Sequence, residues 1–98
     1  MHDEIMTQIE IIKLEKDGCS PCVWLGKTLE ANAQRLESEG ATLTTLNISE
    51  NLTLVDEYKI TSVPVLVFKR NGIEMTRVHG NVNFDDVLAA IEYTKFKK

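Results

Sequence analysis

The chain has 98 residues, of which 43% are hydrophobic and 27% are charged. This composition is typical of a folded soluble domain and excludes extensive disorder, so we expect one domain over residues 1–98. The net charge of −4 and the scattered basic residues exclude a nucleic-acid-binding surface. No apolar run approaches the roughly 20 residues that span a bilayer, and the start lacks a signal-peptide pattern. We therefore expect a cytoplasmic protein without membrane contact.

The first predicted elements are a strand and a long helix. Residues 7–15 form an extended, mostly apolar stretch that predicts a buried strand, and Asp17–Gly18 interrupts it. Apolar residues then recur at helical spacing over residues 20–39, with a proline in the first turn. Gly40 stands where a glycine commonly ends a helix, so we expect one helix up to that point.

A second strand, a short helix and a hairpin follow. Residues 41–48 are rich in threonine and aliphatic side chains, which predicts a strand that completes a β-α-β unit. Ser49 is expected to cap a short helix that ends near Tyr58. Residues 63–68 form a continuous apolar run that predicts a buried strand, and Asn71–Gly72 is a strong hairpin signal.

The last predicted elements are the second strand of the hairpin, at residues 73–79, and a helix that begins at Asn83. Acidic residues in its first turn and lysines at its end suit the helix dipole: Asp85, Asp86, Lys95, Lys97 and Lys98. Its buried face is expected to comprise Phe84, Val87, Leu88 and Ile91. A parallel crossover followed by a hairpin predicts an α/β fold with a four-stranded mixed sheet and helices on both faces.

Cys19 and Cys22 are the only cysteines, and their spacing leaves several interpretations open. A zinc site needs further Cys or His ligands, and only His2 and His79 are available, so a second chain or carboxylates would have to contribute. A structural disulfide would close a loop too short to constrain much of the unfolded chain. The two could also be unreactive thiols.

The remaining interpretation is a redox couple. Cys19 lies between a predicted strand and the start of a helix, where unpaired N–H groups and the helix dipole favour a thiolate. We therefore expect Cys19 to be the nucleophile. Cys22, on the same side of the first turn but deeper, would resolve the mixed disulfide that Cys19 forms. A Cys-X-X-Cys motif beside a β-α-β pattern favours this interpretation.

The sequence resembles small members of the thioredoxin superfamily over roughly residues 7–96. The resemblance rests on "GCSPC" after the first strand, then "KITSVPVLVFKRNG" and "VHG" in the family's order. It implies a thioredoxin-like fold of about glutaredoxin size that lacks the N-terminal strand and helix of full-length thioredoxins. It also implies a cis Val63–Pro64 bond that faces the cysteines. We expect neither a metal site nor a bound cofactor. The substrate-binding residues it implies are Ser20, Pro21, Val63, Pro64 and Gly80.

Several positions depart from the family pattern. Lys27 replaces a helix-kinking proline, so the helix is expected to be straighter, and His79 replaces an aliphatic residue and could tune the pH response of the site. Lys13 stands where thioredoxins commonly carry a buried aspartate beneath the second cysteine, and Thr45 replaces its lysine partner. Either the Lys13 ammonium reaches water, or it lies under Cys22 and favours the Cys22 thiolate.

These features predict a thiol-disulfide oxidoreductase that reduces protein disulfides and is recharged by a flavoprotein of the thioredoxin-reductase type. One alternative is a glutaredoxin-like protein recharged by glutathione, although glutaredoxins usually place proline directly after the first cysteine. Another is a non-catalytic module that uses the cysteine pair as a redox switch. No exposed apolar helix face demands a dimer, so we expect a monomer.

Overall fold

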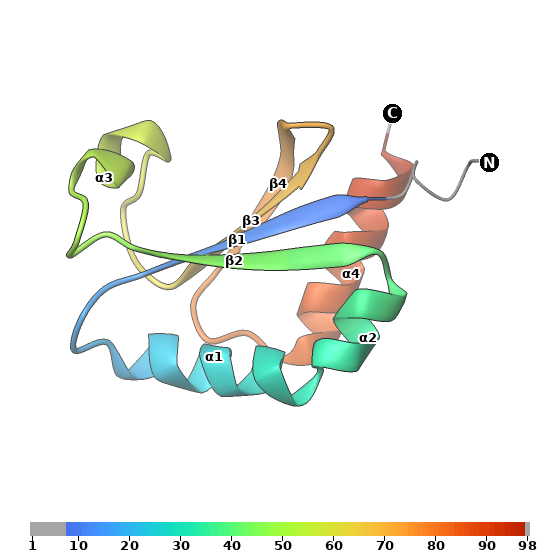
Figure 1. The fold of residues 1–98 in the computed structure, drawn as a ribbon, viewed down its shortest axis with the longest axis horizontal. Helices are drawn as coiled ribbons and strands as arrows, with labels where there is room; N and C mark the ends of the chain where they lie inside the picture. The colour runs from blue at the N-terminus through green and yellow to red at the C-terminus, as the bar shows by residue number, and fades with distance from the viewer. Residues whose placement is uncertain (1–7, 98) are drawn as a thin grey trace.

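The structure is a computed structural model that describes residues 8–97. A four-stranded sheet lies between two layers of helices (Figure 1). The strands are β1 (Ile9–Glu15), β2 (Ala41–Asn47), β3 (Val65–Arg70) and β4 (Ile73–His79). The helices are α1 (Ser20–Ala31), α2 (Ala33–Ser38), α3 (Thr53–Glu57) and α4 (Phe84–Phe96). The predicted strand start at residue 7 and Lys98 at the end of the last helix lie outside the described residues.

The sheet has the strand order β2-β1-β3-β4. β1 and β2 are parallel and joined by α1 and α2, whereas β3 is antiparallel to both β1 and β4. The predicted mixed sheet is therefore confirmed. β2 and β4 are its two edge strands. The carboxyl ends of the parallel strands β1 and β2 lie at the end of the sheet where α1 begins (Figure 1).

Alternation along the central strands divides the core between the two faces of the sheet. Ile9 and Ile11 pack with Leu25, Leu29 and the buried side of α4 on one face. On the other face, a smaller cluster of buried residues packs beneath α3: Ile12, Leu14, Leu54, Val65 and Val67. Because side chains of a strand alternate, Lys13 and Glu15 project to the α1 face with Ile9 and Ile11.

The single long helix predicted over residues 20–39 is wrong. Asn32 separates α1 from α2, with φ −115° and ψ 25°, values outside the helical range. Its side-chain amide donates to the Thr28 carbonyl at 2.8 Å, and its backbone N–H donates to Leu29. Asparagine competes in this way with the regular backbone pattern, which ends α1 one turn before Leu36.

Other element boundaries also shift. Ser49 does not cap a helix; its hydroxyl accepts from the Asp17 N–H, and α3 begins only at Thr53. β3 begins at Val65, after Pro64, and continues to Arg70. The hairpin turn is as predicted, because Asn71 and Gly72 have φ of 55° and 80°, the conformations of a type I′ turn.

The final helix is confirmed at its predicted start. The Asn83 side chain accepts from the Asp86 N–H at 2.9 Å and caps α4. Val87 and Ile91 are buried, and Phe84 and Leu88 pack beside them. None of the described helices is both long and apolar enough to cross a membrane.

Candidate functional site

Cys19 and Cys22 are joined by a disulfide at the start of α1, with their Cα atoms 5.2 Å apart. Cys19 is the N-cap residue of the helix, and its Sγ accepts a hydrogen bond from the Cys22 N–H at 3.2 Å. Cys19 is 8% exposed and Cys22 only 2%. Of the two cysteines, the one at the helix N-terminus is therefore the more accessible.

This position favours a thiolate at Cys19 when the pair is reduced. The first turn of α1 directs its N–H groups toward Cys19, one of them to the Cys19 sulfur itself, and contains no acidic residue. The partial positive charge of the helix start therefore acts on the Cys19 sulfur without an opposing carboxylate in that turn. Ser20 and Pro21 form the exposed start of the helix, and the missing N–H of proline costs no hydrogen bond there.

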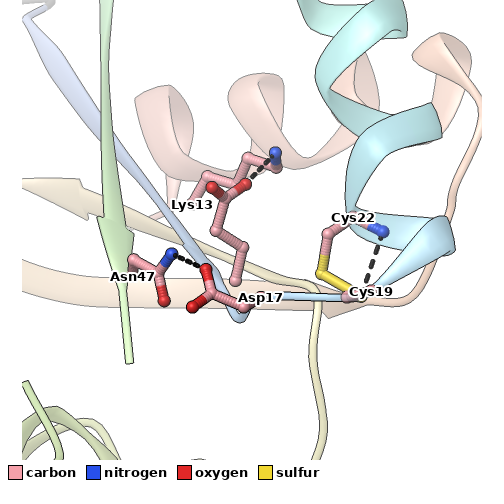
Figure 2. Close-up of polar contacts among 6 residues, drawn as sticks. Lys13, Asp17, Cys19, Cys22 and Asn47 are labelled. Carbon is pink, nitrogen blue, oxygen red and sulfur yellow. Dashed lines mark hydrogen bonds and ion pairs between the residues drawn. A yellow bond between two sulfur atoms is a disulfide. The ribbon is translucent and has the colours of Figure 1, made fainter. Parts of the chain in front are cut away.

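A hollow of about 390 Å³ adjoins the cysteines at the end of the sheet where β2 terminates. Its lining comprises residues 15–20, Cys22, Val23 and Asn47. The Asn47 side-chain amide donates to the Asp17 carboxylate at 2.9 Å (Figure 2). With the bond from Asp17 N–H to Ser49, this contact ties the loop before Cys19 to the end of β2.

Lys13 is buried, with 5% exposure, and lies beneath α1. Its Nζ is 2.5 Å from Glu15 Oε1, and it lies 3.1 Å from the point a Cβ on Gly26 would occupy. The ammonium therefore does not reach into water. It approaches the helix one turn after Cys22, where Gly26 leaves room for it. In the strand register, Lys13 is paired with Thr45.

Val63, Pro64 and Gly80 lie at the same end of the sheet as the cysteines, since Val65 is paired with both Leu14 and His79. The Val63–Pro64 bond is cis. Gly80 has φ +87°, a conformation that side chains disfavour, and its N–H donates to the Pro64 carbonyl at 2.8 Å.

None of these three residues lines the hollow beside the cysteines. His79 is exposed at the end of β4, and its expected influence on the pH response stays a prediction. Within residues 8–97, no three His, Cys, Asp or Glu side chains gather where a metal ion could be held.

Glu15, Asn47 and Gly26 belong to the site although they are not among the residues predicted for it. Glu15 had a readable signal, because residues i and i+2 of a strand share a face and Lys13 is two positions earlier. Asn47 and Gly26 had no such signal. Their role depends on how β2 and α1 pack against β1.

The comparisons with known proteins agree with this geometry. The Thioredoxin family model matches residues 2–93. A thioredoxin of Chlamydia pneumoniae is 30% identical over 76 residues, which are 78% of this chain and 72% of that protein. A thioredoxin of Chlamydia trachomatis is 27% identical over 89 residues, 91% of this chain and 85% of that protein.

The fold matches solved thioredoxin structures. The X-ray structure of Fasciola hepatica thioredoxin has a TM-score of 0.79 at 22% identity and covers 94% of this chain and 86% of its own. A mutant thioredoxin from Halobacterium salinarum also has a TM-score of 0.79, at 24% identity, over 95% of this chain and 81% of its own. The family model, the relatives and the cysteine pair support a thiol-disulfide oxidoreductase, and the chain belongs to the thioredoxin family.

Proposed function

We propose that this protein reduces disulfides of other proteins, with Cys19 as the nucleophile and Cys22 as the resolving thiol. The observation that carries the proposal is the position of the Cys19 sulfur. Cys19 is the more exposed of the two cysteines, and its sulfur accepts the Cys22 N–H at the start of a helix. Both features favour an accessible thiolate, which is the attacking species in thiol-disulfide exchange.

The reaction begins from the reduced dithiol. The Cys19 thiolate attacks one sulfur of the substrate disulfide, the substrate S–S bond breaks, and the released substrate thiolate takes up a proton. Cys22 then loses its proton and attacks the Cys19 sulfur of the mixed disulfide. The second substrate thiol leaves, and the Cys19–Cys22 disulfide forms. Two electrons have moved from this protein to its substrate.

A reductant must return two electrons to the Cys19–Cys22 disulfide in each cycle. Membership of the thioredoxin family and the proline of the CSPC motif support a flavoprotein of the thioredoxin-reductase type as the donor. Glutathione is the alternative donor. The two differ in one measurable respect, since the flavoprotein draws its electrons from a nicotinamide cofactor and glutathione does not require one.

Reduction of insulin disulfides tests the proposal, with each electron donor supplied in parallel. Wild type should reduce insulin with the flavoprotein reductase and much more slowly with glutathione alone. The Cys19→Ser variant is the control and should be inactive with both donors. Turnover with glutathione only would favour the glutaredoxin-like alternative. If the wild type cycles between dithiol and disulfide but reduces no protein with either donor, the protein is a redox switch and the proposal is wrong.

A further inference from the structure

The outer edge of β2 is open. Within residues 8–97, no segment pairs with it, because β2 is the terminal strand of the sheet. The Ile9 N–H donates to the Gly40 carbonyl and the Ile48 N–H donates to the Glu15 carbonyl, so the even-numbered residues of β2 direct their backbone N–H and C=O groups toward β1. In a parallel ladder the backbone groups of the intervening residues point away from the partner strand. Ala41, Leu43 and Thr45 therefore direct their backbone N–H and C=O groups outward.

This edge also lacks the features that usually prevent pairing with another chain. Proline, charged side chains and bulges commonly protect edge strands. The opposite edge, β4, has such protection, since Glu74 and Arg77 form an ion pair on it and its pairing with β3 is interrupted at Phe68/Lys69. β2 reads ATLTTLN, without a charge or a proline. Its residues 42–45 are exposed.

A groove of about 580 Å³ runs between β2 and the two helices α1 and α2. Leu29 and Leu36 lie at its buried side, and Ala41, Leu43 and Thr45 of β2 line it. The outward backbone groups of β2 and the groove thus belong to the same three residues. A strand added to this edge would place every second side chain in the groove.

The groove leads to the cysteines. Val23, which is 56% exposed, lines both the groove and the hollow beside the disulfide. Asn47, the last residue of β2, lines that hollow together with Cys19 and Cys22. A strand paired with β2 would therefore reach the disulfide at the Asn47 end.

We infer that the open edge of β2, with its groove, docks an extended segment of the disulfide-containing protein that the Cys19–Cys22 pair reduces. The segment has small apolar side chains at alternate positions and pairs with Leu43 and Thr45 through its backbone. Its cysteine adjoins one end of this stretch. The inference rests on the proposed function, because it takes the docked partner to be the substrate.

The chemistry of the groove favours an extended apolar segment. The charged residues that line it are of both signs, Lys13 and Lys27 against Glu30 and Glu37, so they favour no strongly charged partner. Free N–H and C=O groups on β2 require a partner with a complementary backbone edge, which a helix lacks. A second copy paired through β2 would occupy the same groups. Self-association is therefore an outcome that the experiment must detect.

The first experiment measures docking without any redox chemistry. The probe is a peptide of alternating valine and threonine that contains no cysteine, and the readout is amide hydrogen exchange in the wild-type protein. Binding should slow exchange at Leu43 and Thr45 at least tenfold. Thr44, whose N–H faces β1, should change little, and a peptide with aspartate in place of valine should have no effect. Unchanged exchange at Leu43 and Thr45 would overturn the inference, as would protection that rises with protein concentration when no peptide is present.

The second experiment measures the consequence for reduction. The same peptide carries a cysteine at one end or the other, in a mixed disulfide with 2-mercaptoethanol, and its reduction rate is compared with that of cysteine protected in the same way. The second-order rate constant for reduction by wild type should be about tenfold higher for the peptide than for cysteine alone, which corresponds to about 1.4 kcal/mol of docking free energy. Leu43→Lys and Thr45→Pro should each remove this advantage, because one charges the groove and the other deletes an outward N–H.

Thr44→Lys is the matched control, since Thr44 is exposed and projects to the opposite face of the sheet. This variant should still reduce the peptide about tenfold faster than cysteine alone. An advantage that survives both Leu43→Lys and Thr45→Pro would overturn the inference. The exchange experiment distinguishes failure of this inference from failure of the proposed function. A protein that reduces no disulfide can still show peptide-dependent protection of the Leu43 and Thr45 amides.

Discussion

Lys13 and Glu15 form a charged pair on β1, in which the lysine is buried and the glutamate is partly exposed. The ammonium lies against Gly26 on α1, and the carboxylate lines the hollow that contains Cys22. Their 2.5 Å contact balances the two charges. Removal of the Lys13 charge therefore leaves an uncompensated carboxylate in the hollow that Cys22 also lines, where water screens it only in part.

Lys13→Met should slow resolution of the mixed disulfide. The substitution leaves the Glu15 carboxylate uncompensated, which disfavours a second negative charge on Cys22 and shifts its titration to higher pH. The first attack by Cys19 should change little, because its charge is stabilised by the helix start. NMR titration of the thiols and stopped-flow fluorescence of the exposed Trp24 measure the two steps separately.

Two variants provide controls for Lys13. Lys16→Met removes an exposed lysine of the same segment and should have a smaller effect, because solvent screens its charge. Lys13→Met combined with Glu15→Gln removes both charges and should restore much of the resolution rate. A Cys22 titration that is the same in Lys13→Met and wild type would show that the pair has only a structural role.

Among the helices and strands, the break at Asn32 is the main feature that the sequence did not predict. The strand β1, the Asn71–Gly72 turn and the capped start of α4 follow from local patterns, and each was predictable. The division into α1 and α2 was not, because helical spacing of Leu25, Leu29 and Leu36 continues across it. It depends on a side-chain bond to the Thr28 carbonyl, which competes with helix continuation by a small energy difference.

An ion pair connects the residue after α2 with α4. Glu39, directly after α2, accepts hydrogen bonds from Lys95 at 2.7 Å and from Arg35 at 3.0 Å. The hydrogen bond from Lys95, then that from Arg35, holds the pKa of the Glu39 carboxyl below its usual value. A carboxyl with a lowered pKa in the folded state stabilises the fold above its unfolded-state pKa, and this contribution is lost as pH falls through the folded-state pKa.

Glu39→Gln should therefore lower the free energy of unfolding at pH 7 by about 0.2–1 kcal/mol, the range of partly exposed ion pairs. The difference from wild type should shrink as pH falls below about 4, where the unfolded carboxyl is protonated. Urea denaturation at pH 7 and pH 3 measures it, with Glu37→Gln in the last turn of α2 as the control. An equal loss of stability at both pH values would contradict a role for the ionised carboxylate.

On the scale of the whole molecule, strand order brings the site together. Cys19 follows β1, Asn47 ends β2 and Pro64 precedes β3, and all three lie at one end of the sheet because β1 is paired with both neighbours. The β-α-β unit and the CSPC motif made this end predictable. The groove under β2 was not predictable, since it depends on where the broken helix leaves the sheet uncovered.

The protein should have a reduction potential of roughly −200 to −270 mV, the range between glutaredoxins and thioredoxin. The CSPC motif supports this value, because it contains no histidine or other residue that would strongly stabilise a thiolate within it. Equilibration with glutathione buffers, followed by mass spectrometry of the alkylated thiols, measures the potential. A value near −120 mV would make the protein an oxidant and reverse the proposed direction of electron flow.

The central claim is that Cys19 attacks and Cys22 resolves, and trapping of substrate disulfides tests it most directly. Each single variant, reduced, is mixed with an oxidised protein substrate, and covalent complexes are counted by mass spectrometry. Cys22→Ser should accumulate a mixed disulfide through Cys19, because attack proceeds and resolution cannot. Cys19→Ser should accumulate almost none, because the remaining thiol is buried in the first turn and is not at the N-cap position. Equal trapping by the two variants, or trapping through Cys22 alone, would contradict the assignment.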